Sequence, residues 1–125
     1  MRYMLLIHDE EAAFDNLSEA DIGQVMAEYG AFGQAVEEAG ICQSCDRLHP
    51  TAMATTVRVQ EGKTLTTDGP FAETKEQLGG YYLIDVKNLD EAIQWASRVP
   101  SAKFGCVEVR PIWEPEESVA DDASA

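Results

Sequence analysis

The sequence predicts one α+β domain in which two helices cover one face of an antiparallel sheet. Three observations support this class. A length of 125 residues suits one hydrophobic core. Short runs of strand-forming residues occur along the chain, and two longer segments carry apolar residues at intervals of three and four positions. These segments follow each other in the order β, α, β, hairpin, β, α, β, without an internal repeat.

The first strand and the first helix have clear signals. Residues 2–8 (RYMLLIH) form a short apolar run, which predicts a buried strand. A helix is predicted from Ser18, a suitable N-cap, to Gly40, which can end it. The apolar stripe of this helix consists of Ile22, Val25, Met26, Tyr29, Phe32 and Val36.

The middle of the chain predicts extended structure. Residues 41–48 form a weaker strand, and residues 55–70 form a hairpin that turns at Glu61 and Gly62. Residues 81–86 (YYLIDV) predict another buried strand.

The last helix and strand follow. Asn88 can cap a helix over residues 89–98, with Glu91 at the third position, and Pro100 ends it. Residues 105–113 alternate polar and apolar side chains, which predicts a strand with one buried face.

This order predicts a ferredoxin-like sandwich with both helices on one face of the sheet. The other face then needs a cover, and we expect a second copy of the chain to supply it in a two-fold dimer. Residues 1–113 form the domain, and residues 114–125, with five acids and no base, are expected to be a solvated tail.

The charge excludes several classes of partner. The chain has 23 acidic and 9 basic side chains, a net charge of −14, so nucleic acids and anionic membranes would be repelled. The first residues do not form a secretion signal, and the three cysteines are an odd number, so we expect reduced thiols in the cytoplasm.

Residues 57–114, together with residues 1–8, resemble the DGPF-domain branch of the YCII-related family. The resemblance rests mainly on Asp68-Gly69-Pro70-Phe71 followed by Glu73, Lys75 and Glu76. It implies a dimeric α/β barrel built from ferredoxin-like halves. Members of this branch are often encoded near extracytoplasmic-function sigma factors, so the resemblance implies a link to sigma-factor regulation.

Some members of the wider family have been proposed to use a His-Asp pair for acid-base chemistry. This chain departs from that pattern, because its long helix has no histidine and offers Tyr29 in the corresponding region. What matches is Asp68, and His8 is the histidine near a strand end on the same side. A histidine can act as acid or base near neutral pH, although a structural hydrogen bond also explains one at a strand end.

The segment from Asp68 to Glu76 is interpreted both as a loop and as the rim of a pocket. An Asp-Gly-Pro turn needs Asp68 to bond its own backbone, but it does not need Glu73, Lys75 and Glu76. Phe71 is expected in the core, with stacking on a ligand as the alternative. Gly79 and Gly80 allow positive φ or a close backbone approach, and no phosphate-binding glycine pattern is present.

Cys42 and Cys45 form a C-x-x-C sequence. In an extended strand, positions three apart point to opposite faces, and the pair does not begin a helix, so a redox role is not predicted. With His49 the pair provides three ligands, one fewer than zinc usually takes, so no metal site is predicted.

Two functions remain open. The first is an enzyme without an organic cofactor, in which Asp68 and His8 transfer protons to a small molecule and Tyr29 contributes to the pocket. Its other ligand contacts would be Phe71, Glu73, Lys75 and Glu76. The second is a binding or accessory module whose DGPF loop holds a partner or builds the dimer.

Overall fold

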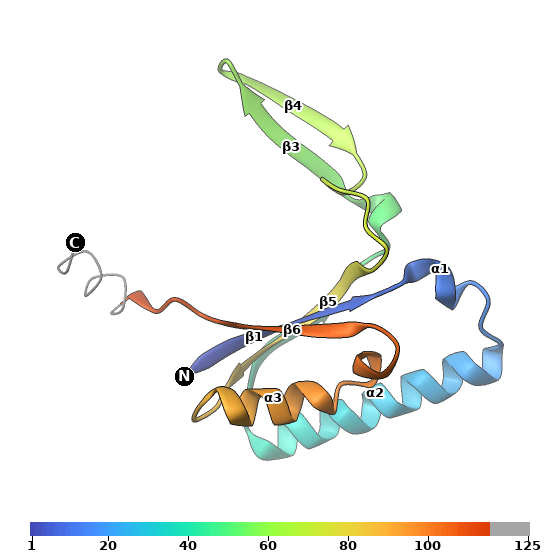
Figure 1. Cartoon of the computed structure of the whole chain (residues 1–125), viewed down its shortest axis with the longest axis vertical. Helices are drawn as coiled ribbons and strands as arrows, with labels where there is room; N and C mark the ends of the chain where they lie inside the picture. The colour runs from blue at the N-terminus through green and yellow to red at the C-terminus, as the bar shows by residue number, and fades with distance from the viewer. Residues whose placement is uncertain (116–125) are drawn as a thin grey trace.

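The computed structural model describes residues 1–115, and in this part of the chain a four-stranded sheet carries two helices on one face (Figure 1). The helices are α2 (Glu19–Ala39) and α3 (Leu89–Ser97). The sheet has the antiparallel order β2–β5–β1–β6, so the predicted α+β class is confirmed and the order is compatible with a ferredoxin-like sandwich. Its strands are β1 (Arg2–Asp9), β2 (Cys42–Arg47), β5 (Gln77–Asp85) and β6 (Cys106–Pro111).

Both long helices begin at the predicted caps. The Ser18 hydroxyl accepts a hydrogen bond from the backbone N–H of Asp21 at 3.1 Å, and Gly40 ends α2 in the left-handed conformation with φ 68°. At the start of α3, the Asn88 side chain accepts a hydrogen bond from the N–H of Glu91 at 3.0 Å. These local signals therefore place both helices correctly.

The core lies between the helices and the sheet. Alternate residues of β1 are buried, and Leu5 and Ile84 are fully excluded from solvent, each contributing about 1.5–3 kcal/mol by burial. The Phe32 ring packs edge-on against Tyr82 and Trp95, with ring centroids 5.1 and 6.3 Å away. The buried residues are Tyr3, Leu5, Ile7, Phe32, Val36, Ile84, Val86, Ala92, Ala96 and Val99.

The opposite face of the sheet carries an apolar strip. Met4 pairs with Leu83 and Leu6 pairs with Tyr81, and because their neighbours along β1 point to the core, these four side chains point away from the helices. All four are partly buried. We call them the open-face strip.

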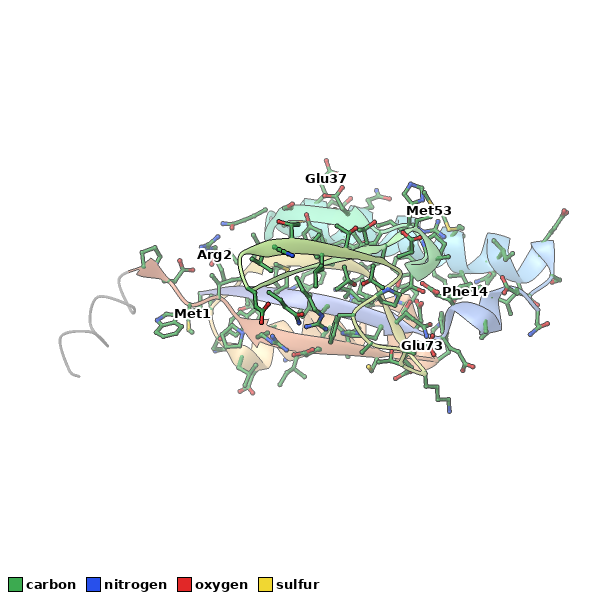
Figure 2. The ribbon with its side chains drawn as sticks, turned by 90° about the horizontal axis from the view of Figure 1, so that it is seen from above. Met1, Arg2, Phe14, Glu37, Met53 and Glu73 are labelled. Carbon is green, nitrogen blue, oxygen red and sulfur yellow. The ribbon has the colours of Figure 1, made fainter. Side chains whose placement is uncertain are left out.

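The hairpin is separate from the main sheet, which differs from the prediction of one continuous sheet. It consists of β3 (Thr55–Gln60) and β4 (Lys63–Asp68), and its turn has φ 51° at Glu61 and 76° at Gly62. It projects on the side of the sheet opposite the helices (Figure 1) and lies over the open face when seen from above (Figure 2). A two-stranded hairpin alone is marginally stable in water, so this element calls for a further contact.

Three short elements were not predicted. They are α1 (Glu11–Phe14) and the 3₁₀ helices η1 (Thr51–Met53) and η2 (Pro100–Lys103). The Phe14 ring packs edge-on against Phe104 at 5.8 Å and ties α1 to the segment after η2. Segments of three or four residues are too short to show a helical period, so the sequence carried no signal for them.

The end of the described chain is tied to its beginning. Glu114 accepts hydrogen bonds from Nε and a terminal nitrogen of Arg2 at 2.8 and 2.9 Å. The remainder of the predicted acidic tail, from residue 116, lies outside the described residues. Within residues 1–115, no helix is both long enough and apolar enough to cross a membrane.

Two glycines allow backbones to approach closely around the end of β1. A Cβ at Gly105 would lie 2.1 Å from the carbonyl oxygen of His8, and a Cβ at Gly80 would lie 2.9 Å from the carbonyl oxygen of Asp46. The expected close backbone approach is therefore confirmed at Gly80, where the neighbouring backbone is that of β2. Strand β5 begins at Gln77, earlier than predicted, so Gly80 lies inside it.

We predict that Gly105→Ala lowers the free energy of unfolding by about 1–3 kcal/mol, because the added carbon must displace the backbone of β1. Gly30→Ala is the matched control: a Cβ there meets nothing within 4 Å, and the change should stabilise helix α2 by about 0.5–1 kcal/mol. Urea denaturation measures both. A Gly105→Ala protein as stable as the unmodified one would contradict the close approach.

Candidate functional site

A hydrogen-bonded chain of three side chains lies where β1 ends against the helix layer. The hydroxyl of Ser101 is fully buried and donates to Oδ2 of Asp9 at 3.1 Å. It also forms a short hydrogen bond with the hydroxyl of Tyr29. Because Ser101 gives its one proton to Asp9, Tyr29 donates to Ser101. We call these three residues the Asp9 cluster.

Three separate elements supply the cluster. Asp9 is the last residue of β1, Tyr29 lies in α2, and Ser101 lies in η2. The Gly105 N–H donates to the carbonyl of Ser101 at 2.7 Å and closes η2. The close approach of Gly105 to His8 therefore brings η2 directly against the end of β1.

The Asp9 carboxylate also borders the position of Gly79. A Cβ at Gly79 would lie 3.5 Å from Oδ1 of Asp9 and 4.0 Å from Oδ2. Within residues 1–115, and apart from the chain neighbours of Gly79, these two oxygens are the only atoms within 4 Å of that position, and a longer side chain there would extend over Oδ1. Ser101 donates its hydrogen bond to Oδ2, so Oδ1 is the Asp9 oxygen that is not bonded to Ser101.

Burial raises the pKa of Asp9 above its ordinary value of 3.8. The hydrogen bond from Ser101 opposes this shift, as does the charge of Arg47, whereas Glu11 and Glu76 add to it. Burial also raises the pKa of Tyr29. The cluster therefore contains a carboxyl group that holds its proton more tightly than a solvated aspartate does.

Glu11, two residues after Asp9, connects the cluster to the base of the hairpin. The two carboxylate oxygens of Glu11 accept hydrogen bonds from the backbone N–H and the hydroxyl of Thr51, both at 2.8 Å. The Glu11 N–H donates to Oε1 of Gln77 at 2.9 Å. The hairpin thus begins and returns beside the site, although its strands extend away from it (Figure 1).

A family model described as the YCII-related domain matches residues 1–116. The chain belongs to the YCII-related family. It is 41% identical over 114 residues to an uncharacterised protein of Rhizobium meliloti (strain 1021), and the alignment covers 90% of this chain and 92% of that protein. The resemblance to the YCII-related family is confirmed, and the name of the relative describes no activity.

In this YCII-related chain, Asp68 lies apart from the Asp9 cluster. It is exposed at the end of β4, opposite Thr55, and within residues 1–115 its carboxylate makes no hydrogen bond. The turn is held instead by Gly69, whose N–H donates to Ala54 O at 2.7 Å and whose carbonyl accepts from Thr56 at 2.8 Å. Within residues 1–115, these two contacts of Gly69, one to a backbone carbonyl and one from the Thr56 hydroxyl, therefore take the place of the expected bond from Asp68 to its own backbone.

His8 lies on the open face of the sheet. Its Nε2 is 3.8 Å from Oε1 of Glu108, and among the described residues no hydrogen bond or ion pair joins it to Asp68. Tyr29 is in the helix layer on the other side of the sheet. One chain therefore does not assemble the expected group of Asp68, His8 and Tyr29, and only Tyr29 reaches the Asp9 cluster.

The rest of the DGPF segment runs along the surface. Phe71 is 80% exposed, so the expectation that it packs in the core is wrong, because residues 69–76 lie outside any strand or helix. Glu73 and Lys75 are exposed as well, and Glu73 lies at the same end of the sheet as Phe14 and Met53 (Figure 2). Glu76 is partly buried, and its charge acts on Asp9.

Sequence reasoning missed Asp9 and Ser101. Asp9 directly follows the strand predicted over residues 2–8, and no motif in the sequence marks it. Ser101 lies in VPSAK, which resembles an ordinary helix exit, and no local pattern indicates that its hydroxyl is buried. An acid at the end of a buried strand is the signal that could have drawn attention to Asp9.

The cysteines are arranged differently from the expectation. The register between β2 and β5 shifts between Cys42 and Ser44, so Cys42 pairs with Ile84 and Cys45 pairs with Tyr82. Ile84 and Tyr82 both face the core, and the expectation that Cys42 and Cys45 point to opposite faces is wrong. Across residues 1–115, no group of three or more His, Cys, Asp or Glu residues could hold a metal ion.

Proposed function

We propose that the protein binds a small polar molecule in the cytoplasm and exchanges a proton with it at Asp9. The observation that carries this proposal is the partly buried Asp9 carboxylate, with a raised pKa, joined through buried Ser101 to Tyr29. General acid-base catalysis needs a group whose pKa is shifted towards the working pH and whose position is fixed. Asp9 meets both requirements.

The two oxygens of Asp9 have different roles in this proposal. Oδ2 accepts the hydrogen bond from Ser101, which fixes the carboxylate and stabilises its charged form. Oδ1 borders the space beside Gly79 and receives the proton from the ligand. The Tyr29 hydroxyl is hydrogen-bonded to the Ser101 hydroxyl, so two hydroxyl groups and one carboxyl group form one continuous hydrogen-bonded chain.

The charges around the site favour an uncharged or cationic ligand. The charges of Glu11 and Glu76 both raise the pKa of Asp9, and the charge of Arg47 opposes them. The whole chain carries a net charge of −14, which would repel an anion during its approach. We propose no organic cofactor and no resident metal.

Asp68 and His8 keep a proposed role as ligand contacts, supplied when two copies associate. His8 lies on the open face, and the hairpin that carries Asp68 projects over that face (Figures 1 and 2). A second copy on the open face would approach both residues. The exposed Phe71, Glu73 and Lys75 would contribute to the same rim.

The association itself is proposed as a two-fold dimer that closes into an α/β barrel. The open-face strip (Met4, Leu6, Tyr81 and Leu83) offers apolar surface that no helix within residues 1–115 covers (Figure 1). Two sheets pack face to face about 10 Å apart through such side chains. The family resemblance supports the same arrangement.

A non-enzymatic binding or accessory module, with a possible link to sigma-factor regulation, is the second candidate. The observation that favours it is the exposed hairpin, in which Val57, Val59 and Leu65 are 58%, 67% and 45% exposed. Such a surface suits a macromolecular partner.

The function is tested with NMR spectra of the ¹⁵N-labelled protein and a set of small ketones, amides and aliphatic amines, with aliphatic carboxylates for comparison. We expect ketones, amides or amines to shift the signals of Asp9, Gly79 and Ser101, and carboxylates to bind more weakly. Asp9→Asn should weaken binding roughly 10- to 100-fold, because a hydrogen bond to a charged group is lost. Asp90→Asn, an exposed acid of α3, is the control.

For bound ketones, proton transfer is read as deuterium entering the carbon next to the carbonyl in D₂O. Exchange that Asp9→Asn abolishes supports acid-base catalysis, and binding without exchange supports the binding module. Ligands that instead occupy the hollow beside α3, which Lys87, Trp95 and Arg98 help to line, would contradict the assignment of the site.

We predict that Leu83→Lys converts a dimer into a monomer at micromolar concentration, because its cross-strand neighbours Met4 and Ser44 carry no acid and the lysine would be buried without a partner. Sedimentation velocity measures this. Met26→Lys replaces a 52% exposed methionine of the helix layer and should leave the dimer intact. A folded monomer before any substitution would contradict the dimer.

A further inference from the structure

Cys42 and Cys45 occupy neighbouring positions on the same face of β2, an edge strand of the sheet. Their partners on β5 are Ile84 and Tyr82, which are two residues apart and both face the helix layer. Gln43 is the extra residue that the bulge adds between Cys42 and Ser44. The bulge therefore turns a pair that would face opposite ways into a pair that faces the same way.

The spacing that results is suitable for a disulfide. The three residue intervals from Cys42 to Cys45 lie opposite the two intervals from Ile84 to Tyr82, and two intervals of a strand span roughly 6–7 Å. Disulfides join residues whose Cα atoms are about 4.4–6.8 Å apart. A bulge also bends its strand, which shortens the span further. The two thiols are thus within reach of each other without moving another strand.

The two thiols differ in their surroundings. Cys45 is exposed, whereas Cys42 is partly buried against the cluster of Ile7, Phe32, Val36 and Val99. The Cys42 thiol donates a hydrogen bond to the carbonyl of Ser44 at 3.5 Å, which keeps it beside the bulge. Burial raises the pKa of Cys42, and the neighbouring Cys45 adds to this effect. The exposed thiol can meet a reagent first, and the buried thiol follows.

We propose that Cys42 and Cys45 form a reversible disulfide within β2 and that a low-molecular-weight disulfide is the oxidant. Cys45, as a thiolate, attacks one sulfur of the small disulfide and releases one small thiol. Cys42 loses its proton to solvent, attacks the Cys45 sulfur of the mixed disulfide and releases the second small thiol. The two protein thiols lose two electrons, and the small disulfide gains them.

Cys106 is the internal comparison. It is also exposed, and burial and the nearby carboxylates of Glu76 and Glu108 raise the pKa of its thiol. It lies on β6, at the opposite edge of the sheet from β2, so it cannot resolve a mixed disulfide on Cys45. If the disulfide forms only between Cys42 and Cys45, Cys106 must therefore stay reduced.

The test uses the full chain and oxidised glutathione as the probe, followed by N-ethylmaleimide and mass spectrometry. The oxidised protein should be about 2 Da lighter and bind one N-ethylmaleimide instead of three, with the disulfide inside the tryptic peptide of residues 3–47. Dithiothreitol should restore three reactive thiols. Closure should become faster as the pH rises towards the raised pKa of Cys42, because the thiolate is the attacking form.

Three variants separate the steps. Cys42→Ser should stop at a stable glutathione adduct on Cys45, Cys45→Ser should form no internal disulfide, and Cys106→Ser should oxidise like the unmodified chain. Thermal unfolding of each variant shows that it remains folded. A persistent glutathione adduct on the unmodified chain, disulfides between two chains, or three reactive thiols after oxidation would overturn the proposal.

Discussion

The buried hydroxyl of Ser101 is the contact on which the arrangement of the site depends. A buried hydroxyl without a partner costs about 1–3 kcal/mol. Helix η2 can therefore pack against the end of β1 only where other polar groups form hydrogen bonds with the buried Ser101 hydroxyl. Asp9 and Tyr29 supply those groups from a strand and a helix. Gly105 lets the backbones come close enough for the contact to form. The same hydrogen bonds therefore allow the helix layer to pack against β1 and position the groups of the site.

The parts of the fold that depend on local interactions could be predicted from the sequence. Ser18 and Gly40 bound helix α2, Asn88 begins α3, and Glu61-Gly62 makes the hairpin turn, because each acts within a few residues of itself. The position of the hairpin was not predictable in this way. Its own pattern fits a strand of any sheet, and only tertiary contacts decide whether it joins the main sheet.

The candidate site was predicted in part. Tyr29 was identified, but its partners Asp9 and Ser101 lie 20 and 72 positions away in the sequence, and no motif links them. The turn chemistry of Asp68 is visible in the sequence, whereas the burial that raises the pKa of Asp9 is not. The bulge at Gln43 was likewise not visible in the sequence. This one inserted residue reverses the side of the sheet to which Cys45 points.

The NMR titration of the Asp9 side-chain carboxyl carbon tests the central claim most directly. We predict a midpoint above 3.8, a further increase in Ser101→Ala, which loses the opposing hydrogen bond, and a decrease in Glu76→Gln. Ser97→Ala, an exposed serine of α3, should leave the midpoint unchanged. The stability that Asp9 contributes should be complete below pH 3.8 and be lost as the pH rises through the folded-state pKa. A midpoint at or below 3.8 that Ser101→Ala does not move would contradict the account.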